Sequence, residues 1–181
     1  MIENKDLLMS IQPQWVYKIC NRIKTIEVRK TKSKYDPKFR IFIYCTKGGE
    51  QIHILDQKTV VKGKSTVRPD LNLNGKIVGH CTCTEIREFR WDDFNHCYDI
   101  DDDSLSASCL TQEQLYEYGK GQTLYGYVLS TFMMYCAPCD ISEAYQRVDE
   151  KHIKTLKTAP QSWGYIHGVG GAFLYESKHS S

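Results

Sequence analysis

The sequence predicts a mainly β fold of the α+β class, with short helices beside a mixed sheet or a small closed barrel. Segments rich in β-branched and aromatic residues recur along the chain, whereas two or three segments favour short helices. The strands and helices also fail to alternate as a doubly wound parallel sheet would require. Of the two architectures that remain, the small barrel is favoured.

The chain begins with a predicted strand and helix. Leu7 to Ile11 is a short apolar run, and Pro13 follows it closely. Proline suits the first turn of a helix, because its missing N–H has no intrahelical partner there. Apolar residues at helical spacing then continue from Trp15 to Ile23. We therefore expect a two-turn helix whose apolar face, including Trp15, packs on the core.

A second strand is expected over residues 25–29, whose sequence TIEVR alternates with period two. The alternation places Thr25, Glu27 and Arg29 on one face, with Lys24 at the end of the strand. A guanidinium binds phosphate, an ammonium adds positive charge, and a carboxylate accepts from a base amino group or holds the arginine. The set suits an anionic or polar ligand, although an exposed strand with an ordinary ion pair gives the same pattern.

The rest of the chain extends the β pattern and adds one clear helix. The further predicted elements are strands over 40–46, 75–86, 124–129, 132–135 and 163–166, and a helix from the N-cap Thr111 through about Tyr118. The polar stretch 50–74 indicates a long hairpin or an inserted loop, and Asp101 to Asp103 indicates a surface loop. We expect a single domain over residues 1–181, with insertions or long loops at about 50–74 and 88–110.

The start of the chain is polar and mixed in charge, without the basic and apolar segments of a signal peptide. The sequence also has no apolar run near the roughly 18–20 residues that cross a bilayer. We therefore expect a cytoplasmic protein with no membrane partner.

Eight cysteines occur along the chain, and in a protein that is not exported we expect reduced thiols that pack as small apolar groups. Cys136 and Cys139 have the CxxC spacing of metal and redox sites, but the sequence has no second such pair. Packing is the default interpretation, so no metal and no cofactor are expected. The sequence alone leaves metal binding by this pair open.

Charge is unevenly distributed, although the net charge is only +2. Residues 18–47 hold ten Lys and Arg against Glu27 and Asp36, whereas residues 91–103 hold six Asp. Local positive density, rather than net charge, attracts phosphate groups. Residues 18–47 are therefore the candidate segment for binding RNA, and the acidic segment 92–103 is the candidate segment for binding a basic protein partner.

Three parts of the sequence resemble the ASCH (activating-signal-cointegrator homology) family, whose members are similar to PUA domains. Residues 8–15 and 21–30 are similar to the family's opening strand, helix and Lys-Thr-x-Glu-x-Arg strand. Residues 75–79 resemble the strand on which the family returns across its barrel. Residues 159–163 resemble the closing Pro-Gln-Ser-Trp of bacterial and phage members. Together these segments span nearly the whole chain.

The resemblance implies a PUA-like pseudo-barrel of five or six strands, with a basic cleft beside the first helix that binds RNA or a nucleotide. The residues implied at this cleft are Ser10, Gln12, Lys24, Thr25, Glu27, Arg29, Lys30, Ser162 and Trp163. Trp163 is either a stacking platform for a base or core filling.

Two other functions stay open at this stage. Some family members are reported as hydrolases of acylated nucleosides or of RNA, which implies Lys24 and Glu27 as catalytic residues in the same cleft. The amidohydrolase-like members carry Lys-Thr-x-Thr where this chain has Glu27, so the sequence departs from their pattern. The third function is a protein-interaction module that docks a basic partner on residues 92–103. The ligand and the oligomeric state are left open.

Overall fold

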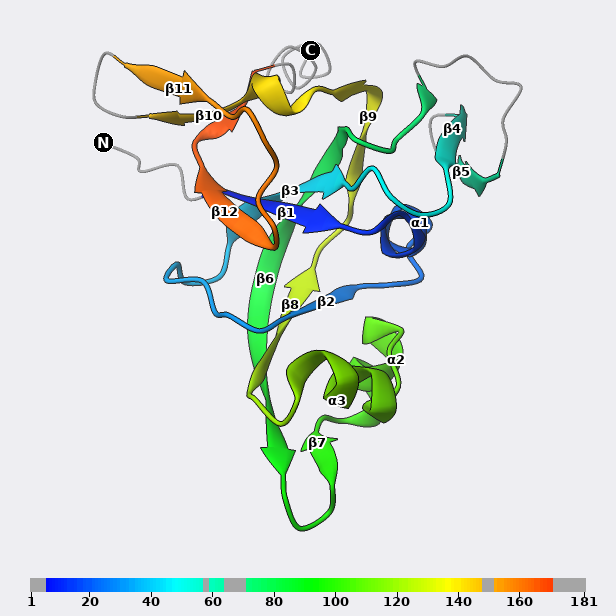
Figure 1. Cartoon of the computed structure of the whole chain (residues 1–181), viewed down its shortest axis with the longest axis vertical. Coiled ribbons are helices and arrows are strands. Elements are labelled where there is room, and N and C mark those ends of the chain that lie inside the picture. The colour runs from blue at the N-terminus through cyan, green and yellow to red at the C-terminus, as the bar shows by residue number, and fades with distance from the viewer. Residues whose placement is uncertain (1–5, 57–58, 64–70, 148–151, 171–181) are drawn as a thin grey trace.

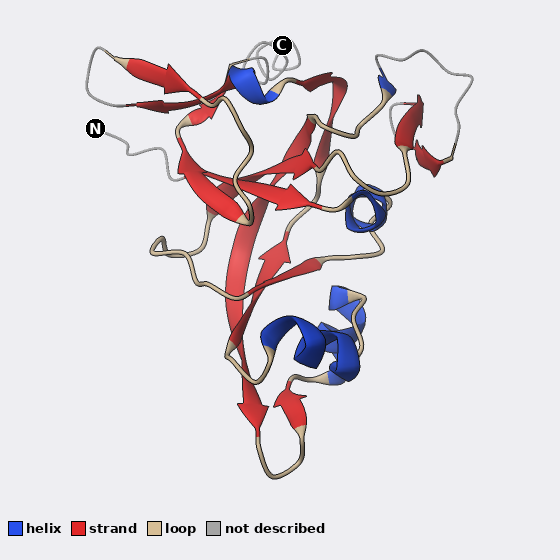
Figure 2. Cartoon of the chain, viewed as in Figure 1, coloured by secondary structure: helices blue, strands red, loops and turns tan. Residues whose placement is uncertain are grey.

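The computed structural model describes residues 6–56, 59–63, 71–147 and 152–170 (Figure 1). In these ranges the chain is mostly strand and loop, with a few short helices (Figure 2). The mainly β, α+β class expected from the sequence is confirmed. Within the same ranges, no helix is long and apolar enough to cross a bilayer.

One curled sheet forms the body of the structure. Its strands are β1 (Asp6–Ile11), β2 (Ile26–Arg29), β3 (Phe39–Cys45), β6 (Ile77–Asp92), β7 (Cys97–Asp99), β8 (Leu124–Leu129), β9 (Met133–Cys139) and β12 (Trp163–Ile166). The described strands run in the order β12-β1-β3-β6-β8-β2, and β7 and β9 also pair with β6. β1 and β3 are parallel, and the other pairs of this sheet are antiparallel. The sheet curls into a half-barrel (Figure 1).

β6 is the strand around which the sheet curls. Its first half pairs with β3 and β9, and its second half pairs with β8 and β7. The partners change at Cys83, which lies opposite Phe39 of β3 and Leu129 of β8. The register to β8 shifts between Cys83 and Glu85, and such a bulge bends a strand. The strand predicted over 75–86 is therefore longer than expected, because its end carries a second set of partners.

α1 (Pro13–Cys20) follows β1 and begins at the expected proline. Its eight residues give the two turns expected from the sequence, and Ile23, one turn further on, lies beyond the helix and is 54% exposed. The helix ends because the Asn21 side-chain amide donates to the Tyr17 carbonyl, and because Arg22 adopts a left-handed backbone with φ of 59°. This end directs the chain into β2.

A lobe built from α2 (Asp102–Ser108), α3 (Gln112–Gly119) and β7 lies beside β2. Its buried side chains are Ile26, Val28, Phe89, Tyr98, Leu115 and Leu124. α3 begins with a capping box, in which Thr111 and Gln114 bond each other's backbone N–H groups, as the N-cap prediction requires. The lobe has its own small core and holds α3 across from α1.

The expected surface loop at Asp101 to Asp103 is wrong. The Asp101 carboxylate accepts from the backbone N–H of Ser104 and caps α2, which starts at Asp102. Acidic side chains are favoured in the first turn of a helix, because the N-terminal end carries partial positive charge. Residues 88–110, expected as an insertion or a long loop, hold the end of β6, β7 and α2.

The remaining described elements are smaller. β4 (Ile52–Asp56) and β5 (Thr59–Lys62) form a hairpin beside α1, which fits the hairpin alternative for residues 50–74. Residues 57–58 and 64–70 of that segment lie outside the described residues. The short helix η2 (Ile141–Glu143) leads to a second sheet of β10 (Ala144–Arg147), β11 (Ile153–Thr155) and β13 (Gly168–Val169).

Candidate functional site

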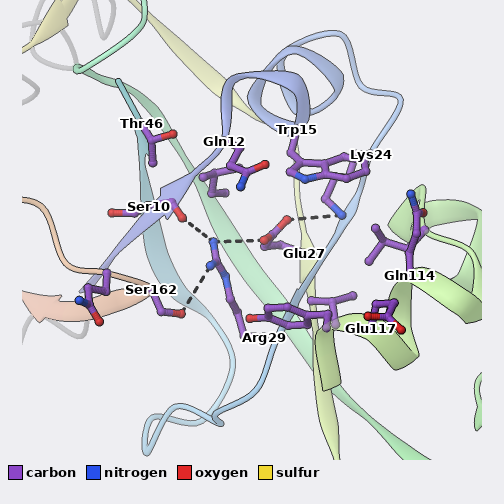
Figure 3. A pocket seen from close by; sticks show the side chains of 15 residues that line it. Ser10, Gln12, Trp15, Lys24, Glu27, Arg29, Thr46, Gln114, Glu117 and Ser162 are labelled. Carbon is purple, nitrogen blue, oxygen red and sulfur yellow. Dashed lines mark hydrogen bonds and ion pairs between the residues drawn. The ribbon is translucent and has the colours of Figure 1, made fainter. Parts of the chain in front are cut away.

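A pocket of about 820 Å³ lies between α1, β2 and α3. It is bounded by the end of β1 and the start of α1, by the residues before β12, and by the α3 face that looks back at β2 (Figure 3). Figure 3 shows Ser162 on one side of the pocket and Gln114 and Glu117 of α3 on the opposite side. The pocket is therefore formed by segments that lie far apart in the sequence.

Three charged side chains meet on the floor of the pocket. Lys24 Nζ lies 3.4 Å from Glu27 Oε2, and Arg29 Nη2 lies 3.1 Å from Glu27 Oε1. The three residues are only 3%, 7% and 8% exposed, respectively. Charged groups are rarely buried to this extent unless they are paired. One anion between two cations leaves this charge cluster with a net positive charge.

Backbone and hydroxyl acceptors hold the two cations in place. Lys24 Nζ donates to the carbonyl of Ser108, the last residue of α2, at 2.5 Å. A cation at the C-terminal end of a helix is favourable, because the last carbonyls are unpaired and carry partial negative charge. Arg29 Nη2 donates to the Ser10 carbonyl at 2.8 Å, and Arg29 Nη1 lies 3.4 Å from Ser162 Oγ. The cluster thus connects β1, β2, α2 and the residues before β12.

Part of the cluster's hydrogen-bonding capacity is unused. Among the described residues, neither Glu27 Oε2 nor Arg29 Nε has a hydrogen-bond partner. A buried polar atom without a partner costs about 1–3 kcal/mol, so native structures usually satisfy such atoms. Both atoms belong to residues that line the pocket, although the atoms themselves are buried beneath its surface.

The pocket walls add aromatic rings to this charged floor. Trp15 of α1 and Tyr118 of α3 both line the pocket. The ammonium groups of Lys18 and Lys24 lie 4.9 Å and 5.3 Å from the Trp15 ring centroid, and that of Lys30 lies 4.9 Å from the Tyr118 centroid. Partly buried aromatic rings with cations held near them favour an anionic ligand with a flat ring.

Six of the nine residues expected at the site line this pocket, namely Ser10, Gln12, Lys24, Glu27, Arg29 and Ser162. The Ser10 hydroxyl donates to the Pro160 carbonyl at 2.5 Å, which ties the residues before β12 to β1. Gln12 is exposed at the start of α1. The proximity of the β1 end, β2 and the Pro-Gln-Ser-Trp segment agrees with the arrangement that the sequence motifs imply.

Thr25, Lys30 and Trp163 lie outside the pocket lining. The expectation that Thr25 shares a face with Glu27 and Arg29 is wrong, because β2 begins only at Ile26. Thr25 is exposed and borders a different hollow near Thr131.

Lys30 is exposed beside Tyr118, and Trp163 is half-buried against the main core. The Trp163 indole N–H donates to the Thr31 hydroxyl at 3.0 Å, and its ring packs edge-on against Tyr165. Trp163 therefore does not close the pocket as a stacking platform. Its ring lies beside the pocket, next to the lining residue Ser162.

Several lining residues were not among the candidates from the sequence. Trp15 was expected to be core filling, yet it is partly buried and also lines the pocket. Gln114, Glu117 and Tyr118 reach the pocket because the lobe folds back over β2. The helical pattern of residues 112–119 identifies α3, but only the tertiary packing determines which of its side chains face the charge cluster.

The CxxC pair lies within a strand. Cys136 and Cys139 belong to β9, where Cys136 is exposed and Cys139 is buried. Residues three apart in a strand point to opposite faces, so the two thiols do not converge. Among the described residues, no group of three or more His, Cys, Asp and Glu side chains is placed to hold a metal ion. Burial also raises the pKa of the Cys45 and Cys83 thiols to about 12.

Comparison with known proteins gives matches in structure only. No family model matches the sequence, and no curated protein matches it significantly. The chain resembles the crystal structure of ASCH from Zymomonas mobilis, with a TM-score of 0.56 and 15% identity over 96% of this chain and 95% of that chain. A Tyr-to-Phe mutant of that protein gives a TM-score of 0.54 at 16% identity over 95% of this chain and 97% of that chain. A Ser-to-Ala mutant of the same protein gives a TM-score of 0.54 at 16% identity, over 98% of this chain and 99% of that chain. The chain therefore has the fold of an ASCH domain, in the α+β pseudo-barrel form that its sequence motifs predict.

Proposed function

We propose that the protein binds RNA or a nucleotide in the pocket between α1, β2 and α3. The observation that carries this proposal is the buried charge cluster of Lys24, Glu27 and Arg29, which has a net positive charge and forms the floor of the pocket. Two cations next to one anion suit a phosphate group. Glu27 Oε2 forms an ion pair with Lys24 but has no hydrogen-bond partner among the described residues, so it suits an amino group of a base, as carboxylates accept from cytosine in nucleic-acid complexes.

The walls and the size of the pocket support the same ligand class. Aromatic rings at Trp15 and Tyr118 offer surfaces on which a base can stack, at about 1–3 kcal/mol per base. Side-chain amides at Gln12, Gln114 and Gln161 lie around them and both donate and accept hydrogen bonds. The volume of about 820 Å³ lies within the range of about 300–1,000 Å³ that is usual for small-ligand pockets.

Hydrolysis in the same pocket is a second candidate. It is favoured by the Glu27 oxygen that lacks a hydrogen-bond partner among the described residues, 3.4 Å from the Lys24 ammonium. A carboxylate placed in this way can take a proton from an attacking water if the water enters the pocket. Product formation from acylated nucleosides or RNA, detected by mass spectrometry, separates this candidate from binding alone.

The acidic segment 92–103 remains the third candidate, as a docking surface for a basic protein. Two of its carboxylates already serve local structure. Asp92 accepts from the backbone N–H groups of Phe94 and Asn95, and Asp101 caps α2. These local bonds account for part of the acidic character without a partner, so the pocket carries the stronger proposal.

Binding to fluorescein-labelled octauridylate, measured by anisotropy at about 50 mM and about 200 mM salt, tests the proposal. We expect affinity that falls with salt. Arg29→Lys keeps the charge but loses the planar fork, so it should weaken binding by at least about tenfold.

Gln12→Ala and Gln51→Ala form a matched pair, because both side chains are exposed and only Gln12 lines the pocket. We expect Gln12→Ala to weaken binding and Gln51→Ala to leave it unchanged. Absence of binding at low salt, together with no binding of the four ribonucleoside monophosphates, would contradict the proposed function.

A further inference from the structure

We infer that a single-stranded RNA bound in the pocket continues over one defined side of the molecule. This side is a lysine–aromatic strip formed by Lys32, Lys34, Tyr35, Trp163 and Tyr165, with Thr31 at its centre. The inference rests on the proposed function and adds a second contact site for the nucleotides that follow the one in the pocket. The strip lies in the loop between β2 and β3 and on β12.

The loop that carries the lysines is held by three aromatic side chains with polar tips. The Tyr127 hydroxyl donates to the Thr31 carbonyl at 3.0 Å and accepts from the Ser33 N–H at 2.7 Å. The Tyr165 hydroxyl accepts from the Lys34 N–H at 2.9 Å. Together with the indole N–H of Trp163 on the Thr31 hydroxyl, these bonds fix the loop backbone. A loop that is already ordered loses less conformational freedom on binding.

The exposed parts of the strip combine positive charge with aromatic rings. Lys34 Nζ lies 4.9 Å from the ring centroid of Tyr165 and 5.5 Å from that of Tyr35. The two tyrosine rings pack edge-on at 4.7 Å, and Tyr165 packs in the same way against Trp163 at 5.2 Å. The three rings are half-buried, whereas Lys32 and Lys34 are exposed. Lys32 Nζ forms a surface ion pair with Glu88 Oε1 at 3.0 Å, and a phosphate that binds Lys32 replaces this carboxylate. Aromatic rings interleaved with cations are the usual platform for single-stranded nucleic acid.

The strip is continuous with the pocket through the chain itself. Ser162 lines the pocket and is followed by Trp163, and Arg29 lines the pocket and is followed by Lys30 and the loop. Figure 3 shows Arg29 and Ser162 on the same side of the pocket, away from α3. A strand that places one phosphate at Arg29 therefore meets the strip directly when it leaves on this side.

The opposite side of the pocket disfavours a polyanion. Residues 92–117, which include β7, α2 and α3, hold eight Asp and Glu and no Lys or Arg. Residues 30–40 hold five Lys and Arg against one Asp. Phosphodiester chains are attracted to the basic side and repelled from the acidic side, so the charge distribution selects one exit.

The test compares uridine monophosphate with octauridylate on the full-length protein. Lys32→Ala/Lys34→Ala removes two exposed amino groups outside the pocket lining. If both contact phosphates, the slope of log affinity against log salt for the octamer should fall in magnitude by about 1.4, at about 0.7 for each phosphate of a single strand. Affinity for the monophosphate should stay unchanged. Lys154→Ala/Lys157→Ala is the matched control, because it removes the same charge from exposed positions on and after β11.

The possible results separate this inference from the proposed function. A smaller octamer slope in the Lys32/Lys34 variant, with the monophosphate and the control variant unaffected, supports the strip. Equal octamer slopes in the wild type and the Lys32/Lys34 variant, or an equal loss in the control, would overturn it while the pocket proposal stands. Failure of the wild type to bind either probe would overturn both.

Discussion

Removal of the central carboxylate from the buried charge cluster is the sharpest perturbation that the structure offers. Glu27 lies 3.4 Å from Lys24 Nζ and 3.1 Å from Arg29 Nη2, and all three side chains are at most 9% exposed. Glu27→Gln keeps the shape of the side chain but leaves two buried cations without their counter-ion. Breaking a buried ion pair in this way costs about 3–5 kcal/mol. The amide oxygen still accepts from Arg29, so we expect the lower end, about 3 kcal/mol.

Differential scanning calorimetry at neutral pH measures the effect. A loss of about 3 kcal/mol lowers the Tm of a domain of this size by about 6–12 °C. Glu117→Gln is the control, since that carboxylate is 71% exposed and pairs with Lys120 on the surface. An exposed pair of this kind contributes at most about 1 kcal/mol, so its Tm should fall by no more than about 4 °C. A Glu27→Gln protein with the Tm of the wild type would refute the electrostatic account of the cluster.

Replacement of the whole cluster separates stability from binding. In Lys24→Met/Glu27→Leu/Arg29→Met, apolar side chains of similar volume take the place of three buried charges. Such replacements are often neutral or stabilising by about 1–4 kcal/mol, because desolvating the charges opposes folding. We therefore expect a folded protein, with a Tm near or above that of the wild type, that no longer binds octauridylate. Retained binding would contradict the role proposed for the cluster.

Three further predictions concern the surrounding structure. Hydrogen bonds from Ser104 lower the pKa of the Asp101 carboxyl, so its stabilising effect is present above the ordinary carboxyl pKa and is lost as the pH falls through the lowered value. Urea denaturation should therefore give Asp101→Asn a lower free energy of unfolding than the wild type at about pH 7. The difference between the two free energies should shrink from about pH 5 towards pH 2. A difference that stays constant with pH would refute this account of the cap. A Cβ on Gly79 would lie 2.2 Å from the Met133 carbonyl oxygen, so Gly79→Ala should cost about 1–3 kcal/mol in urea denaturation, whereas Gly164→Ala, with its nearest contact at 3.7 Å, should be nearly neutral. Equal effects would argue against close packing of β6 on β9. Iodoacetamide at about pH 8 should label exposed Cys136 first and Cys45 only after unfolding, because burial raises the pKa of the Cys45 thiol to about 12, as peptide mapping can check.

Local signals in the sequence identified much of the fold. Pro13 after an apolar run marked the start of α1, and Thr111 marked the N-cap of α3. These signals act within one turn of a helix, so they can be read without knowing the tertiary structure. The two-turn length expected for α1 is also observed, and Asn21 and a left-handed Arg22 end the helix although apolar residues continue to Ile23.

The candidate site was only partly accessible from the sequence. The motif around Lys24, Glu27 and Arg29 identified the charged floor, since these residues are close together in the chain. The far wall was not predicted, because it depends on how the lobe of α2 and α3 packs against β2. Thr25 was misplaced for a related reason: strand alternation was extended one residue too far, to a position whose backbone N–H bonds to Ala107 outside the sheet.

The most direct test of the central claim is to map ligand contacts by amide NMR during titration with uridine monophosphate. The claim predicts that the largest chemical-shift changes occur at residues that line the pocket, including Ser10, Gln12, Glu27, Arg29 and Ser162, and that they saturate together. Gln51, which is exposed and does not line the pocket, should change little. Changes confined to residues outside the pocket, or no saturable change at millimolar ligand, would contradict the claim that this pocket is a nucleotide site.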